Sequence, residues 1–475
     1  MQNSLLQRTL NMPPLLTLTP PEPNRKTPRQ CSRTVWFLLA ISVALGAHSQ
    51  ARALSLQQAA ELALTNDPQY LAAQKAARSS EEVLNQAKGA QRPFVAATAS
   101  LGQSELELTS GSGANTTLSP RSYRLSLSQS LLNPELKAGV RQAQAGLSAS
   151  EAALENARQQ TLLRLAKAYF DILAAQDSLS TVRSEKAAIA EQLELAKRSF
   201  EVGTATVTDQ HVAQARFDLV QAREIQAQNT LSIRRNGLAV LIRQPAPERL
   251  EGIGQSIAIP SPEPARIDDW IQQALRSSPA VIQAQAIAKA AQEAVEKARG
   301  ADRPTLGLQL SHGRNWESSA PGQDVRTTAI GIELSVPLWQ AVAPAAIRQA
   351  QADSEQAGHQ AESAQLSAEQ TARAAFLNVT AGLAQVAALE AAETSSKLAL
   401  ASNRLGYEVG VGTNIDVLNA QQQLFAAQRD LFQARYDTLL ASLELQAATG
   451  QLQLTNLQAM SNLILNSAAA PKKSP

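Results

Sequence analysis

Apolar residues recur at every second position in four short stretches of the chain and at every third or fourth position along most of the rest. The alternation is strict over 122–130, 306–311 and 330–336, and less regular over 94–108. A two-residue period places the apolar side chains on one face of a β-strand. Residues 110–120, between the first two strands, are rich in Gly, Ser, Asn and Thr, as expected of a solvent loop. The pattern predicts two β-hairpins.

Helical spacing dominates the remainder and predicts two very long helices. The first begins at Pro134, after an Asn133 cap, and meets no strong break before Gly203. Its roughly 68 residues would extend about 100 Å. The second is expected from about Pro344 to Tyr407. Shorter helices are expected over 55–66, 68–89 and 209–242, with a last one ending near Gly450.

The same order of elements occurs twice. Four residues of the first helical turn recur 207 positions later: Phe200 as Tyr407, Gly203 as Gly410, Thr206 as Thr413, and Asp209 as Asp416. Earlier landmarks recur 211 positions later, such as Pro68 as Pro279 and Pro93 as Pro304. We therefore divide the chain into a signal peptide (1–53), a first repeat (54–243), a Pro-rich linker (244–264), a second repeat (265–455) and a disordered tail (456–475).

The two turns that follow the long helices contain the residues that tight helix-to-helix turns need. Gly203 in the first turn, and Gly410 and Gly412 in the second, tolerate the positive φ that ends a helix. A Thr followed three residues later by an Asp is a helix-start signal, and it occurs at Thr206 and again at Thr413. The turns are therefore predicted tips of helical hairpins.

The first 53 residues have the pattern of a secretory signal peptide. Basic residues precede an apolar run over 35–47, and Ala51-Arg52-Ala53 fits a small-x-small cleavage site, with Met12 a candidate start. The single cysteine, Cys31, precedes the apolar run, whereas a lipidated cysteine would follow it. We expect an exported protein without a lipid anchor. No later stretch is expected to be long and apolar enough to span a bilayer as a helix.

The amino-acid composition further narrows the class of protein. Aromatic residues make up only 4% of the 475 residues, which suits Ala-rich helices packed along their length better than large globular cores. Removing the leader takes away six basic residues and one acid, so the net charge of +2 becomes −3 and a nucleic-acid partner loses its support. No nucleophile elbow, phosphate loop or His/Cys cluster indicates an enzyme or a cofactor. The mature histidines, His211, His312 and His359, lack metal-ligand spacing.

The strands predict an oligomer. Two hairpins supply four strands, each with an apolar face and a small polar face. In lipid, strand edges are satisfied only in a closed barrel, and four strands cannot close one. Several copies must pool their strands, and three copies would supply twelve.

The duplicated plan, the FEVGTATVTD and YEVGVGTNIDVLNAQQQL turns and the YRLSLSQSLLNPEL hairpin exit resemble the TolC family of outer-membrane channel-tunnels, over about residues 54–455. The resemblance implies a mainly α fold with a transmembrane β-barrel. It implies a homotrimer with twelve strands in outer-membrane lipid and a periplasmic α-barrel of long hairpins. It further implies a periplasmic adaptor protein, an inner-membrane ABC or proton-driven transporter, and a protein or small-molecule cargo.

The same resemblance implies a gate at the periplasmic tip. Two aspartates of the family form acidic rings there, and they match Asp416 and Asn419, so one carboxylate per protomer remains. A family latch between a tyrosine and an aspartate matches Tyr407 and Asp209. A second latch uses an arginine at the position of Gly412, opposite Thr208, and cannot form here.

Simpler interpretations stay open for these residues. Asp209 and Asp416 each lie in a capping pair that any helix start can use, and Tyr407 can serve packing alone. For the whole chain, a type I protein-secretion outlet, of the kind that exports an RTX toxin such as cyclolysin, is the leading hypothesis because no lipid anchor is expected. The alternatives are a drug or metal efflux outlet and, more remotely, a periplasmic coiled-coil adaptor.

Overall fold

The fold is that of a computed structural model, which describes residues 54–106, 116–250, 252–253, 257–316 and 322–469. The chain divides into two units, Met1–Arg52 and Ala53–Pro475. The predicted leader therefore lies outside the described residues, together with Met12 and Cys31. Parts of both predicted hairpin loops also lie outside them.

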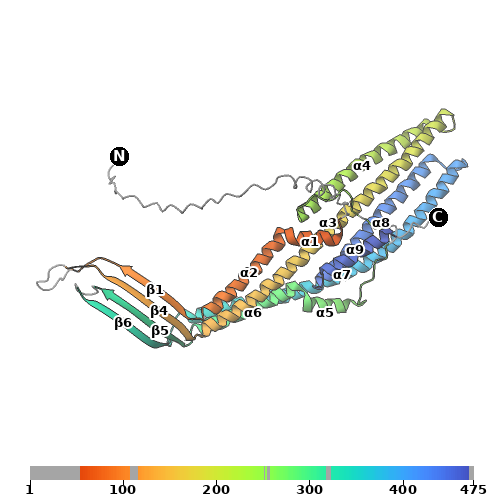
Figure 1. The fold of residues 1–475 in the computed structure, drawn as a ribbon. Coiled ribbons are helices and arrows are strands. Elements are labelled where there is room, and N and C mark those ends of the chain that lie inside the picture. The colour runs from red at the N-terminus through yellow and green to blue at the C-terminus, as the bar shows by residue number, and fades with distance from the viewer. Residues whose placement is uncertain (1–53, 107–115, 251, 254–256, 317–321, 470–475) are drawn as a thin grey trace, which may run out of the picture. The chain divides into compact units, whose positions relative to one another are not determined.

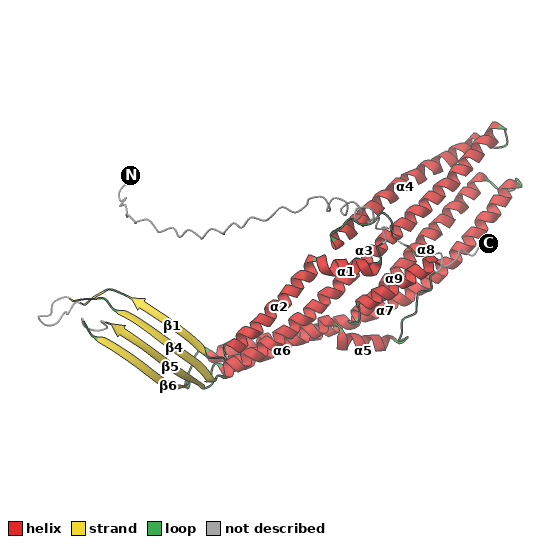
Figure 2. Cartoon of the chain, viewed as in Figure 1, coloured by secondary structure: helices red, strands yellow, loops and turns green. Residues whose placement is uncertain are grey.

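The helices follow the predicted order (Figures 1 and 2). Those of the first repeat are α1 (Leu56–Asn66), α2 (Pro68–Gly89), α3 (Pro134–Glu201) and α4 (Val207–Ile242). Those that follow are α5 (Ile267–Ser277), α6 (Pro279–Gly300), α7 (Ala343–Glu408), α8 (Asn414–Ala448) and α9 (Leu454–Ala469). The predicted start signals have formed: Ser55 and Gln58 make a capping box on α1, and Asn133 accepts a hydrogen bond from the Leu136 N–H at the start of α3.

Both predicted hairpins form and join into one antiparallel sheet. Its strands are β1 (Phe94–Leu101), β4 (Arg121–Leu132), β5 (Thr305–Trp316) and β6 (Asp324–Ser335), in the order β1-β4-β5-β6. The pairing of β4 with β5 joins the two repeats, which the sequence pattern did not predict. The first hairpin continues into a two-stranded ribbon of β2 (Ser104–Leu106) and β3 (Thr116–Leu118).

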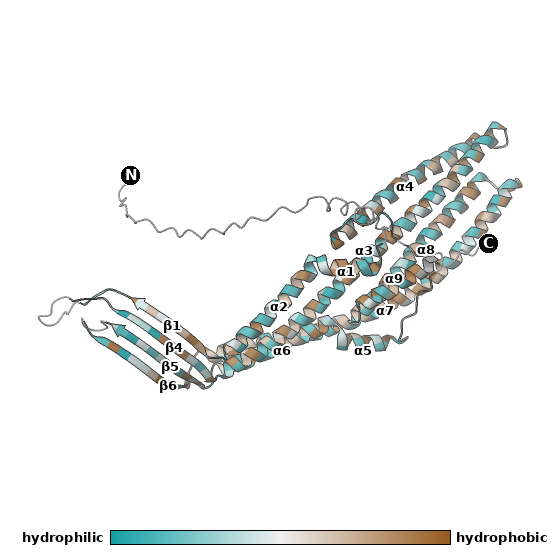
Figure 3. Ribbon diagram, in the orientation of Figure 1, coloured by the Kyte–Doolittle hydropathy of each residue, from teal (hydrophilic) through white to brown (hydrophobic). Residues whose placement is uncertain are grey.

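The long helices pack side by side along most of their length. α3 lies against α2, α4, α6 and α8, and α7 lies against α5, α6 and α8. Leu162, Leu165 and Tyr169 of α3 are buried. Hydrophobic and hydrophilic residues alternate along α3 and α7 rather than segregating into long blocks (Figure 3).

The largest hydrophobic core is formed by α1, α3, α8, the C-terminal end of α4 and parts of the linker and the last helix. Leu56 of α1, Leu173 of α3 and Leu443 of α8 are fully buried there. The linker contributes Leu250, which is also buried. The Pro-rich linker is thus packed against the helices over part of its length.

The prediction of a disordered tail over 456–475 is wrong for residues 456–469, which belong to α9. Leu457, Met460 and Ile464 are buried and join the largest core, where α9 packs against α1. These three side chains share one helical face. The apolar period was present, but the low complexity of the stretch masked it. Residues 470–475 lie outside the described part.

The expectation that no helix after the leader could span a bilayer also needs correction. Within the described residues, α7 contains a window that is long and apolar enough to cross a membrane by length and composition. Alanine raises the mean hydropathy of this stretch without supplying large apolar side chains. α7 packs against α6 and α8, where Ala372 and Ala375 are buried, but only 17% of the apolar stretch is buried within the single chain.

Candidate functional site

The first predicted tip joins α3 to α4 through Gly203. This glycine has a φ of +78°, a conformation that L side chains rarely adopt. The N–H groups of Thr204 and Ala205 both donate to the Ser199 carbonyl, at 2.8 and 3.1 Å, and so satisfy the end of α3. The predicted turn is therefore present.

The second tip joins α7 to α8 and uses its two glycines differently. Gly410 has a φ of +79°. Gly412 is needed for close approach, because a Cβ there would lie 3.1 Å from the Gly406 carbonyl carbon and from the Tyr407 nitrogen. The N–H groups of Val411 and Gly412 both donate to the Gly406 carbonyl at 2.9 Å. Any larger side chain at 412, including an arginine, would require the backbone to shift.

Both aspartates of the predicted gate cap the return helices. Asp416 Oδ2 accepts from the Thr413 hydroxyl at 2.6 Å and from its N–H at 3.1 Å, while the Asp416 N–H donates to the Thr413 hydroxyl at 3.3 Å. Asp209 makes the same set with Thr206 at 2.7, 3.0 and 3.2 Å. The hydroxyl and the N–H of Thr413 hold the pKa of Asp416 below its ordinary value. Asp416 is exposed, so capping leaves it open to ions.

Asn419, the second predicted constriction residue, has a partner that the sequence did not indicate. Arg216 of α4 donates from Nη2 to Asn419 Oδ1 at 3.1 Å and from Nη1 to Gln422 Oε1. Where the resemblance predicts a second carboxylate, the chain thus has an amide held by a guanidinium. Arg216 therefore places a positive charge beside Asn419.

Tyr407 lies half-buried against the core of the second hairpin. Its ring packs beside Leu400, Val417 and Leu424. Within the part of the chain that the structure describes, no hydrogen bond joins Tyr407 to Asp209. A latch between these residues remains a prediction about the closed assembly.

A buried hydrogen-bond chain connects the two tips inside one chain, and sequence reasoning missed it. Gln192 of α3 donates to Asn414 Oδ1 at 2.7 Å, and Asn414 donates to the Asp209 carbonyl at 3.4 Å. Gln192 and Asn414 are only 8% and 2% exposed. Such buried amides lose stability if either partner is removed, because the other is left unsatisfied. These residues therefore fix the start of α8 against the first hairpin.

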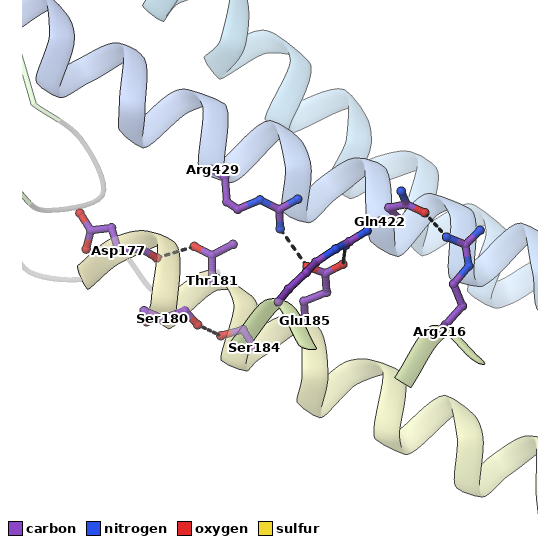
Figure 4. Close-up of polar contacts among 9 residues, drawn as sticks. Asp177, Ser180, Thr181, Ser184, Glu185, Arg216, Gln422 and Arg429 are labelled. Carbon is purple, nitrogen blue, oxygen red and sulfur yellow. Dashed lines mark hydrogen bonds and ion pairs between the residues drawn. The ribbon is translucent and has the colours of Figure 1, made fainter. Parts of the chain in front are cut away.

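A buried carboxylate links the hairpins further from the tips. Glu185 of α3, 1% exposed, accepts from Arg223 of α4 at 3.2 Å and from Arg429 of α8 at 2.8 Å. Figure 4 shows Arg429 and Glu185 reaching toward each other, with the Arg216 to Gln422 contact beyond them. Together these contacts tie α3, α4 and α8 by charge-assisted hydrogen bonds. Partners more than 200 positions apart, such as Glu185 and Arg429, leave no local signal in a single sequence.

Among the described residues, no group of three or more His, Cys, Asp or Glu side chains could hold a metal ion. His312 Nδ1 contacts the Thr328 hydroxyl at 2.7 Å across the sheet, and His359 lies 3.6 Å from Glu362. The described tip residues supply charged groups and polar contacts.

Comparisons with known proteins agree with this geometry. A family model described as "Outer membrane efflux protein" matches residues 59–242 and 270–451. Outer membrane protein TolC of Vibrio cholerae is 32% identical over 87% of this chain and 95% of its own length. Alkaline protease secretion protein AprF of Pseudomonas aeruginosa is 29% identical over 79% of this chain and 80% of its own. The crystal structure of the outer membrane protein VceC from Vibrio cholerae superposes with a TM-score of 0.73, at 22% identity, over 83% of this chain and 96% of that one.

Paired long helices, a four-stranded sheet with an apolar face and two glycine-closed tips define an outer-membrane channel with an extended periplasmic helical region. Its relatives are transport proteins rather than enzymes. The chain belongs to the outer membrane efflux protein family.

Proposed function

We propose that this channel is the outlet of a type I secretion system that exports a protein. The observation that carries the proposal is the similarity to the alkaline protease secretion protein AprF, which extends over 79% of this chain. That relative is named for protease secretion. The outlet of a drug or metal efflux pump is the second candidate, because the matching family model is named for efflux.

The outlet works as a homotrimer together with a periplasmic adaptor and an inner-membrane ABC transporter. The edges of β1 and β6 support the oligomer, because the four-stranded sheet ends at these two strands within the described residues. Backbone groups at an open edge cannot be satisfied in lipid. Three copies would supply twelve strands, a number within the range of closed outer-membrane barrels.

The gate of this outlet lies at the helical tips. Asp416 supplies one ring of carboxylates, and Asn419, which accepts a hydrogen bond from Arg216 of α4, lies one helical turn further along α8. Tyr407 and Asp209 form the latch between hairpins in the closed assembly. The exposure of Asp416 and the buried links around Asn414 support this assignment.

Deleting the gene in its own host, followed by proteomics of the culture medium, tests the cargo class. We expect one or a few large proteins to disappear from the medium and to return when the gene is restored. An unchanged secreted proteome, with raised sensitivity to drugs or metal ions, would instead assign the channel to an efflux pump. Crosslinking to an adaptor is expected in both cases and reports only on the channel itself.

A further inference from the structure

One face of the four-stranded sheet is apolar at one end of the strands and basic and aromatic at the other. Every second residue of β5 lies on this face. The register of the sheet gives the β4 and β6 residues beside each of them. The rows of this face are Leu127–Leu310–Ile330, Leu125–His312–Thr328, Tyr123–Arg314–Arg326 and Arg121–Trp316–Asp324. The first row is wholly apolar, whereas the last two contain three arginines and two aromatic residues.

This face is the one that contacts lipid. The opposite face carries small and polar residues, such as Ser126, Gln309 and Glu333. Strands of outer-membrane barrels turn their apolar side outward and their polar side to the lumen. Ile330 and Ile332 on the apolar face are 78% and 69% exposed in the single chain, as lipid-facing residues should be.

We name the set Arg121, Tyr123, Arg314, Trp316 and Arg326 the basic-aromatic patch. The Tyr123 and Trp316 rings lie 5.8 Å apart, and the Arg314 guanidinium lies 4.9 Å from the Trp316 ring centre. Arg314 also pairs with Asp324 at 2.6 Å. In the part of the chain that the structure describes, Arg121 and Arg326 are exposed and have no ion pair. Among the described residues, the patch therefore carries two positive charges per chain that have no acidic partner.

The depth of the patch follows from strand geometry. Arg314 lies eight residues beyond Leu306 on β5, which is about 26 Å along the strand and about 20 Å along the membrane normal at the usual tilt. The apolar band of such barrels is about 25 Å tall and ends in aromatic girdles. The patch thus lies at the end of the band nearest the hairpin loops. The other strand ends lead into periplasmic helices, so the patch lies in the outer leaflet.

We propose that the basic-aromatic patch binds the phosphate groups of a phosphorylated glycolipid in the outer leaflet. Charge complementarity selects this partner: arginine forks match phosphate oxygens, and long arginine side chains reach from an apolar surface to a headgroup. Tyr123 and Trp316 lie where their rings contact the boundary between acyl chains and headgroups. The proposal rests on the outer-membrane location of the strands and is independent of the cargo.

Native mass spectrometry of the purified oligomer, titrated with diphosphorylated lipid A, tests this proposal. The variant Arg121→Gln/Arg326→Gln removes these two charges and should weaken binding at least about tenfold. Arg121→Lys/Arg326→Lys should retain most of the binding, since lysine also binds phosphate as a point charge. The parent protein should bind lipid A without phosphates, or free inorganic phosphate, far more weakly.

The matched control is Arg124→Gln, which removes one arginine from the same strand on the opposite face and should leave lipid A binding unchanged. Equal binding of the parent and the double Gln variant would overturn the proposal. Equal binding of phosphorylated and dephosphorylated lipid A would do the same. Loss of the oligomer in the double Gln variant, with unchanged lipid binding per chain, would assign these arginines to contacts between protomers instead.

Discussion

Asp416 serves two physical roles that a single substitution at this position would confound. Its carboxylate caps α8 through Thr413, and the same exposed carboxylate is available to attract cations at the tip. The chain offers a way to separate the two roles. Thr413→Ala breaks the cap and keeps the charge, whereas Asp416→Ala removes both.

We predict that Asp416→Ala lowers cation selectivity and block by polyvalent cations in planar-bilayer recordings, because three carboxylates close to one axis would attract cations. Thr413→Ala should preserve selectivity while destabilising the start of α8 by about 1 kcal/mol, seen as faster amide exchange there. Equal selectivity in the parent protein and in both variants would leave Asp416 with a capping role only.

The Asp177 carboxylate lies beside the linker, next to Tyr436 of the largest hydrophobic core. Tyr436 donates to Asp177 Oδ2 at 2.6 Å, and the Ile253 N–H donates to the Tyr436 oxygen at 3.4 Å. Burial raises the pKa of Asp177 from 3.8 to about 6, although the Tyr436 hydrogen bond opposes that shift. The folded state therefore binds this proton more tightly than the unfolded state.

The pH dependence follows from that difference. The protonated Asp177 contributes stability that is complete below pH 4 and is lost as pH rises through about 6, by up to about 3 kcal/mol per chain. Asp177→Asn should remove this dependence, because the amide is neutral throughout and still accepts from Tyr436. Thermal denaturation of both proteins from pH 4 to 8 measures the difference. The same dependence of melting temperature on pH in the parent and the variant would contradict the prediction.

At the scale of elements, close helix packing depends on single small residues. Gly382 of α7 faces Thr438 of α8, and a Cβ at 382 would lie 2.5 Å from the Thr438 hydroxyl oxygen. Thr438 is 1% exposed and donates to the Ala434 carbonyl at 2.7 Å, so its side chain has no room to turn away. The two helices would have to separate to admit one methyl group.

We predict that Gly382→Ala destabilises the protein by about 1 to 3 kcal/mol through overpacking. Gly358→Ala in the same helix is the matched control, since nothing lies within 4 Å of a Cβ at that position. It should be neutral or stabilise by up to about 1 kcal/mol, because alanine is the better helix former. Denaturant unfolding measures the free energy of unfolding of both variants. Equal changes of the same sign in the two variants would reject overpacking as the cause.

Elements with strong local signals could be predicted from the sequence, and contacts between elements could not. Pro68 and Gly89 bound α2 as expected, because a proline after an Asp cap starts a helix. The face of α9 was overlooked among polar neighbours. The hydrogen bond from Gln192 to Asn414 joins residues 222 positions apart on two helices, so no periodicity indicates it. The pairing of Asn419 with Arg216 was missed for the same reason.

At the scale of the whole molecule, the edges of the sheet determine assembly. Within the described residues, β1 and β6 end the four-stranded sheet, and the β6 side chains Ile330, Ile332 and Leu334 are each more than 60% exposed. In lipid these strands need partners from other copies. We predict a trimer in detergent, detected as three chain masses by native mass spectrometry and as heat-modifiable migration on gels. A folded, stable monomer would refute the barrel.

Closure of the whole channel is expected to depend on the Tyr407 hydroxyl. Asp209 Oδ2 is engaged by Thr206, so a latch from Tyr407 would add to the cap rather than replace it. Gly412 has no side chain, so a tyrosine latch would act without a second polar contact from that position. Tyr407→Phe removes only the hydroxyl and keeps the ring against Leu400 and Val417.

We therefore predict a higher resting conductance for Tyr407→Phe in planar bilayers, without loss of the trimer. Tyr407→Ala also removes the packing of the ring and should both raise conductance and lower thermal stability. If Tyr407→Phe conducts as the parent does while Tyr407→Ala is destabilised, the ring packs at the hairpin end and the hydroxyl holds no latch. The closed state would then depend on the buried links through Asn414 and Glu185, which join the two hairpins within each chain.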